Sequence, residues 1–65
     1  MQPLTDVTVK LTGIDGNAFM ILGTVQKAMR RAKVEKSIIE DFQKDATSKD
    51  YDHLLQTVFK YCEVE

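Results

Sequence analysis

The chain has 65 residues, of which 43% are hydrophobic and 29% are charged, and this composition predicts one folded domain and excludes a disordered tail. The single cysteine, Cys62, and the single histidine exclude an internal disulfide framework and a four-ligand zinc site within one chain, and they indicate a reducing, cytoplasmic setting. No apolar run approaches the roughly 20 residues of a membrane span, and the first residues lack the pattern of a signal peptide.

The first predicted element is a short strand. Residues 7–12 alternate β-branched or apolar side chains with polar ones, which is the pattern of a strand with one buried face. A turn is expected at residues 13–16, because glycine accepts a positive φ and Asp bonds its own backbone. The strand residues expected to face the core are Val7, Val9 and Leu11.

The longest predicted helix begins after this turn. Seven apolar residues fall within one arc of about 120°, which is the wide stripe of a helix that lies on a core: Ala18, Ile21, Leu22, Val25, Ala28, Met29 and Ala32. Asp15 or Asn17 supplies the N-cap oxygen, and the sequence leaves both alternatives open. The helix is predicted to run to about Lys33, with a basic last turn that suits the negative end of the helix dipole.

A break separates this helix from a second one. The apolar residues of 38–46 are rotated by about 90° from the first stripe, so a single straight helix would divide its buried face. We therefore predict a break within residues 33–37. Residues 37–40 (SIIE) fit a capping box that starts at Ser37, and a start one turn earlier at Glu35 is the alternative. The second helix is expected to end near residue 46 or 47.

A third helix and a second strand follow. Asp50 is the expected N-cap, and Asp52 adds negative charge to the first turn, where the helix dipole favours it. Residues 62–65 alternate as in a short strand and are expected to pair with residues 7–11. The apolar face predicted for the third helix consists of Tyr51, Leu54, Leu55, Val58 and Cys62.

These elements predict a single α+β domain over residues 1–65. Three helices pack on a two-stranded sheet in the order strand, helix, helix, helix, strand, and the strands are Val7 to Leu11 and Glu63 to Glu65. A chain of this length has little room for a self-sufficient core, so association with another chain is also considered. The residues assigned to the core are Val9, Leu11, Leu22, Val25, Met29, Phe42, Leu54, Leu55 and Val58.

Two motifs are fairly specific: residues 15–19 (DGNAF) with 22–23 (LG), and residues 46–48 (ATS) with 50–58 (DYDHLLQTV), followed by the ending 63–65 (EVE). In these motifs the chain resembles a family of short uncharacterised bacterial and phage-encoded proteins. The resemblance extends over nearly the whole chain and implies no activity, cofactor or partner. Family members tend to carry glycine where this chain has Lys33 and Lys49, which implies helix ends at these positions.

Three features invite a chemical interpretation, and a structural interpretation is favoured for each. Gly13 to Gly16 resembles a phosphate-binding loop, but Asp15 would repel an anion and the lysine of a P-loop is missing. His53 follows Asp52, but adjacent helical residues point about 100° apart, so a solvated histidine is favoured. Cys62 is interpreted as a small core residue. The sequence therefore predicts no catalytic residue, no cofactor and no metal site.

Positive charge is concentrated at the end of the first predicted helix. Residues 26–36 carry five bases against Glu35, a local charge of +4, whereas residues 37–65 sum to −4. Such a face suits nucleic-acid phosphates or an acidic partner. The whole chain has a net charge of −1 and aromatic residues are not interleaved with the bases, so a solvated helix face is favoured. The bases are Lys27, Arg30, Arg31, Lys33 and Lys36.

Phe19 and Met20 are apolar but lie at the edge of the buried stripe or outside it. The favoured interpretation is that the lead segment or Phe59 covers them, because a small fold has few places for extra apolar groups. Gly23 lies close by and permits close approach of another segment. The alternative is a contact surface for a protein partner, including a weak homodimer that opposes basic and acidic faces.

The function favoured by these features is a small, non-enzymatic protein-interaction or regulatory module, with a phage or mobile-element origin suggested by the resemblance. No convergent set of titratable groups is found at any spacing, which argues against an enzyme. The expected partner is a protein and not a membrane. The alternative is nucleic-acid binding through Lys27, Arg30, Arg31 and Lys33.

Overall fold

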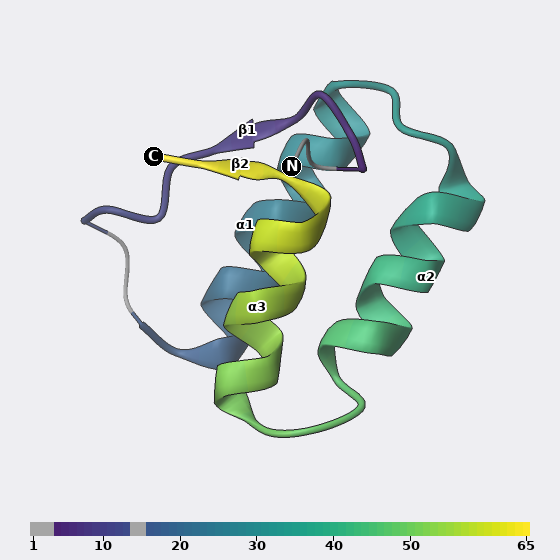
Figure 1. The fold of residues 1–65 in the computed structure, drawn as a ribbon. Helices are drawn as coiled ribbons and strands as arrows, with labels where there is room; N and C mark the ends of the chain where they lie inside the picture. The colour runs from purple at the N-terminus through teal and green to yellow at the C-terminus, as the bar shows by residue number, and fades with distance from the viewer. Residues whose placement is uncertain (1–3, 14–15) are drawn as a thin grey trace.

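The computed structural model describes residues 4–13 and 16–65, which contain three helices and two short strands joined by turns and irregular segments (Figure 1). Each helix contacts the other two, and the strands lie side by side, with β1 against α1 and β2 against α3. The predicted α+β class and element order are confirmed. The elements are β1 (Thr8–Val9), α1 (Ala18–Arg31), α2 (Lys36–Ala46), α3 (Tyr51–Tyr61) and β2 (Glu63–Val64).

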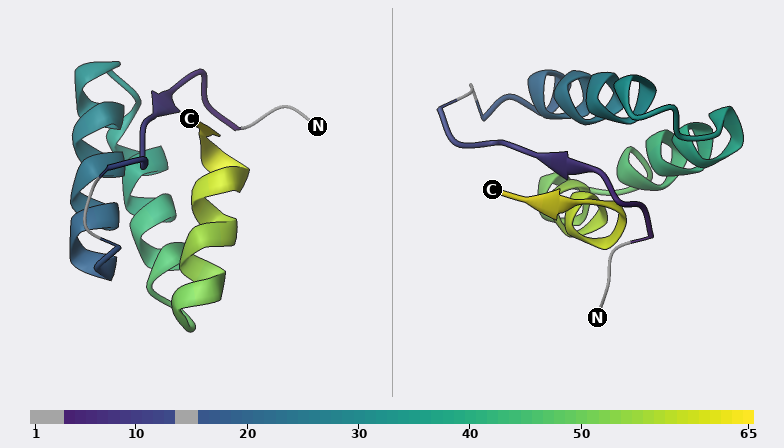
Figure 2. Two further views of the ribbon diagram at one scale, coloured as in Figure 1. Left: turned by 90° about the vertical axis from the view of Figure 1, so that its left-hand side faces the viewer. Right: turned by 90° about the horizontal axis from the view of Figure 1, so that it is seen from above.

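The two strands are parallel neighbours, and all three helices lie between them in the chain. Val9 pairs with Val64, and beyond the regular strands the Leu11 amide donates to the Glu65 carbonyl at 3.3 Å. Seen from above, β1 lies between α1 and β2 (Figure 2). The predicted pairing is confirmed, although the regular strands are shorter than expected. A parallel pair requires a long crossover connection, which the three helices provide.

The first turn of α1 is capped by Asn17. Its side chain accepts a hydrogen bond from the Phe19 amide at 2.8 Å, which satisfies one of the amides that have no partner within a helix. Asp15, the other candidate for the cap, lies outside the described residues, as does Ile14.

The last turn of α1 ends in a Schellman motif. The Val34 amide donates to the Met29 carbonyl and the Lys33 amide to the Arg30 carbonyl, both at 3.0 Å. Lys33 has a φ of 61°, the left-handed conformation for which glycine is the usual residue. The helix end expected near Lys33 is therefore confirmed, with the last helical residue two positions earlier.

The helix α2 begins at Lys36 and its N-cap is Glu35. The amides of Ile38 and Ile39 donate to the Glu35 carbonyl at 3.0 and 3.1 Å. The capping box predicted to start at Ser37 is wrong, and the alternative start at Glu35 is correct. The reason is that the Schellman motif turns the chain at residues 33 and 34, so the next helix follows at once.

The helix α2 ends at Ala46, as predicted, three residues before Lys49, so no helix end falls at that lysine. Asp50 then caps α3, because its carboxylate accepts a hydrogen bond from the His53 amide at 3.0 Å. This predicted cap is confirmed.

The core lies between the inner faces of the helices and beneath β1. Its centre includes Phe42 and Tyr61, whose rings meet edge to face at 5.4 Å between centroids. Six assigned core residues are buried, whereas Leu11, Leu22 and Leu55 are only half-buried, because they lie at the margins of the helix and strand faces. The buried apolar residues are Val7, Val9, Ile21, Val25, Met29, Phe42, Ala46, Leu54, Val58, Tyr61 and Cys62.

Tyr51 does not belong to the buried face of α3, contrary to the prediction. It lies in the first turn of α3 and is 44% exposed. Its hydroxyl donates to the Gly16 carbonyl at 2.6 Å, which ties the start of α3 to the segment that precedes α1. A tyrosine at the edge of an apolar face thus uses its polar end for a link between two elements.

Candidate protein-interaction surface on the first helix

The first turn of α1 presents two large apolar side chains to solvent. Phe19 is 83% exposed and Met20 is 50% exposed. Phe59, which was expected to help cover them, is itself 61% exposed on α3, and Leu4 in the lead segment is exposed as well. The favoured interpretation of an intramolecular cover is therefore wrong. The helix turns Ile21 inward, so Phe19 and Met20, two and one positions before it, point away from the core.

The same side of α1 becomes basic toward its last turn. Lys27, Arg30 and Arg31 are exposed, and at 3.6 residues per turn they share an arc of about 120° with Phe19 and Met20. We call these five residues the outer face of α1. Gly23 lies near its centre, and a Cβ placed there would meet no atom of the described residues within 4 Å. None of the described segments therefore uses the close approach that Gly23 permits.

A groove of about 350 Å³ separates the basic half of α1 from β1. Lys27 and Arg31 line it from the helix, and Lys10, which follows β1, lines it from the other side. Sequence reasoning missed Lys10. The strand alternation indicates that Lys10 points away from the buried face, but only the fold shows that it lies opposite α1.

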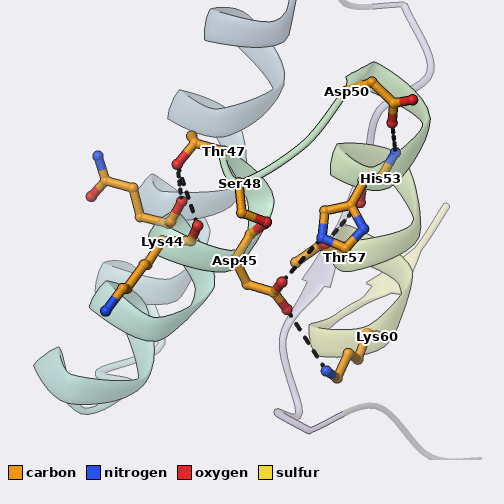
Figure 3. Close-up of polar contacts among 9 residues, drawn as sticks. Lys44, Asp45, Thr47, Ser48, Asp50, His53, Thr57 and Lys60 are labelled. Atoms are coloured by element: carbon orange, nitrogen blue, oxygen red, sulfur yellow. Dashed lines mark hydrogen bonds and ion pairs between the residues drawn. The ribbon is translucent and has the colours of Figure 1, made fainter.

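His53 is part of a polar cluster between α2 and α3 (Figure 3). Its Nε2 lies 3.0 Å from Oδ1 of Asp45, and Nζ of Lys60 lies 3.7 Å from Oδ2 of the same carboxylate. We call Asp45, His53 and Lys60 the α2–α3 seam. The prediction of a solvated histidine is wrong, because the His53 side chain is only 24% exposed and is paired with Asp45.

In this seam the Asp45 carboxylate is paired with both His53 and Lys60. The hydrogen bond from His53 is the main cause that lowers the pKa of Asp45, and Lys60 lowers it further. Nearby, burial raises the pKa of Tyr61, and the charges of Asp45 and Asp41 add to that rise. One carboxylate shared by a histidine and a lysine of the next helix links α2 to α3.

The other two features considered for chemistry, Cys62 and the loop that contains Gly13, lie in environments that a structural role explains. Cys62 is 1% exposed, as expected for a core residue, and burial raises the pKa of its thiol. Gly13 has a φ of 84°, which suits a turn. Among the described residues, no group of three His, Cys, Asp or Glu side chains is arranged to hold a metal ion. None of the described helices is long and apolar enough to span a bilayer.

Comparison of the chain with known proteins gives no match to a family model, a curated protein or a solved structure.

Proposed function

We propose that the chain is a small, non-enzymatic protein-interaction module that docks through the outer face of α1. The observation that carries the proposal is the exposure of Phe19 in the first turn of α1, beside the half-exposed Met20. Adjacent large apolar side chains of this kind supply anchors in protein interfaces. The bases at the other end of the face would add charge-dependent recognition and faster association.

Two further observations support this class. The inward residues of α1 pack in the core, and Phe19 and Met20 are not among the residues that pack there. Core packing therefore does not explain why these two residues are apolar. The titratable side chains of the α2–α3 seam are occupied with one another, which leaves them little part in chemistry on a substrate. We also place the module in the cytoplasm, with Cys62 reduced, and propose a phage or mobile-element origin from its motifs.

Site-specific photocrosslinking tests this proposal. A photoreactive phenylalanine analogue replaces Phe19 in cells that express the chain, and the matched control carries the same analogue at Phe59, which is also an exposed aromatic but lies on α3. A discrete adduct is expected from position 19 and not from position 59. The adduct should be lost when Met20→Lys is added, because a charge at this position cannot be buried against an apolar partner.

The mass of the adduct identifies the partner. Twice the mass of the chain would indicate the weak homodimer considered above, which sedimentation equilibrium can verify. The proposal fails if position 19 gives no adduct, or if positions 19 and 59 give the same adducts. Circular dichroism of the Met20→Lys variant confirms in either case that the helices are intact.

Nucleic-acid binding is the second candidate, and the exposure of Lys27, Arg30 and Arg31 on one face of α1 favours it. Titration with duplex DNA and RNA at low and moderate salt tests it. Binding that weakens steeply with salt and is lost on reversing these three charges would support this candidate over protein docking.

A further inference from the structure

The groove between β1 and α1 collects positive charge from two elements that are far apart in the chain. Lys10 lines it from the end of β1, and Lys27 and Arg31 line it from α1. None of the described residues that line this groove is acidic. Three cations around one hollow surface give it a positive local potential.

Met20 is not among the residues that line the groove, but it lies one helical turn before Thr24, which does line it. Met20, Thr24 and Lys27 follow one another at helical spacings of four and three residues, and Arg31 continues the row. The Thr24 hydroxyl donates to the Met20 carbonyl at 2.7 Å, so its proton is already used within the helix and does not bond a ligand. Along the helix axis Met20 lies about 10 Å from Lys27, which corresponds to about three residues of an extended chain.

A second groove on the other side of α1 differs in charge. It has a volume of about 470 Å³ and contains the bases Arg30 and Lys36, but Glu40 lies among its lining residues. Its positive potential is therefore partly cancelled. The groove beside β1 is the better site for an anionic ligand.

We propose that the groove between β1 and α1 binds an extended, acidic segment of a partner protein. Its carboxylates lie against Lys10, Lys27 and Arg31, and an apolar side chain about three residues away contacts Met20. The inference rests on the proposed function and adds the chemistry of the partner. Peptide is favoured over nucleic acid because the chain has a net charge of −1 and the row of bases ends in an apolar residue.

Fluorescence anisotropy with a synthetic peptide tests this inference. The probe contains a leucine followed about three positions later by a run of glutamates, in keeping with the rise of an extended chain. The control peptide has glutamine in place of each glutamate. The glutamate peptide should bind, its affinity should fall as salt is added, and the glutamine peptide should not bind detectably.

Charge variants locate the binding. Lys10→Gln and Lys27→Gln should each weaken binding about two- to five-fold, the range of an exposed ion pair. Lys44→Gln on α2 is the matched control and should leave the affinity unchanged, because this exposed lysine is not among the residues that line the groove. Met20→Ser should weaken binding of the leucine peptide but not of a peptide with serine in place of the leucine.

Several results would overturn the inference. Equal binding of the glutamate and glutamine peptides would exclude carboxylate recognition, and equal effects of Lys10→Gln and Lys44→Gln would exclude the groove. Duplex DNA that binds more tightly and displaces the peptide would assign the bases to nucleic acid. If position 19 still gives a crosslink but the peptide does not bind, the proposed protein-interaction function is retained. Only the acidic segment proposed as its ligand is then excluded.

Discussion

The outer face of α1 and the α2–α3 seam use their side chains in opposite ways. In the seam, Asp45 is shared by His53 and Lys60, so polar groups from two helices satisfy one another. On the outer face, Phe19 and Met20 lie exposed beside three cations, and an open glycine lies between the two groups. The seam thus joins two helices of the domain, whereas the side chains of the outer face of α1 are exposed, which is the condition that the proposed docking role requires.

The largest effect that sharpens this comparison comes from two methionines of the same helix. Met29 is fully buried, so Met29→Ala should lower the free energy of unfolding by about 2–4 kcal/mol through lost burial and a cavity. Met20→Ala should change it by less than about 0.5 kcal/mol. Urea unfolding measures both variants. Similar losses in the two variants would break the comparison, because they would show that the outer face supports the fold.

Gly23→Ala should produce the next largest effect, in the opposite direction. The added methyl meets no neighbour, and alanine is favoured over glycine in a helix interior by about 1 kcal/mol. The free energy of unfolding should therefore rise. Gly13→Ala is the matched control and should destabilise, because Gly13 has a φ of 84°. A loss of stability in Gly23→Ala would mean that the outer face is covered in solution.

Lys33→Gly should stabilise the domain by about 0.5–1 kcal/mol, because glycine adopts the left-handed conformation of this position without strain. Thermal or urea unfolding measures the gain. Lys33→Ala removes the same charge but keeps the strained backbone, so it should bring no such gain. Equal stabilisation by both variants would attribute the effect to the charge of Lys33 and not to its backbone.

The smallest effect concerns the seam and depends on pH. Because the pKa of Asp45 is lowered in the folded chain, its carboxylate stabilises the fold above the ordinary pKa of about 4, and this contribution is lost as pH falls through the lower folded pKa. Asp45→Asn should thus be less stable than the parent at neutral pH, and the difference should disappear in acid. Urea midpoints across this pH range measure it.

A double-mutant cycle with His53→Gln measures the coupling between Asp45 and His53. In His53→Gln, the added Asp45→Asn change should cost less than it does in the parent, since the main cause of the lowered pKa is removed. An undiminished cost would show that Lys60, and not His53, carries the interaction.

Local periodicity predicted the element order and the inward side of each helix. The caps at Asn17 and Asp50 are also local features, since each cap is a hydrogen bond between residues two or three positions apart. The start of α2 at Glu35, which was the alternative and not the favoured prediction, depended instead on the preceding turn, where Lys33 takes a conformation usual for glycine.

The site was less accessible from sequence, because its features depend on how elements are placed in space. The pairing of His53 with Asp45 joins residues of two helices, and a helical wheel shows only one helix at a time. Lys10 lies across a groove from Lys27 and Arg31 because β1 packs beside α1. The exposure of Phe19 depends on whether any other segment reaches it, which the periodicity of α1 does not determine.

The parallel pairing of β1 and β2 has a mechanical consequence. The strands run in the same direction, so a force applied through residues 4 and 65 pulls on the leading end of one strand and the trailing end of the other. Hydrogen bonds such as those from Glu63 to Val7 and from Glu65 to Val9, at 2.9 and 2.8 Å, would then be loaded in shear and would share the load. The short sheet acts as a clamp that must slide before the helices behind it can be extended.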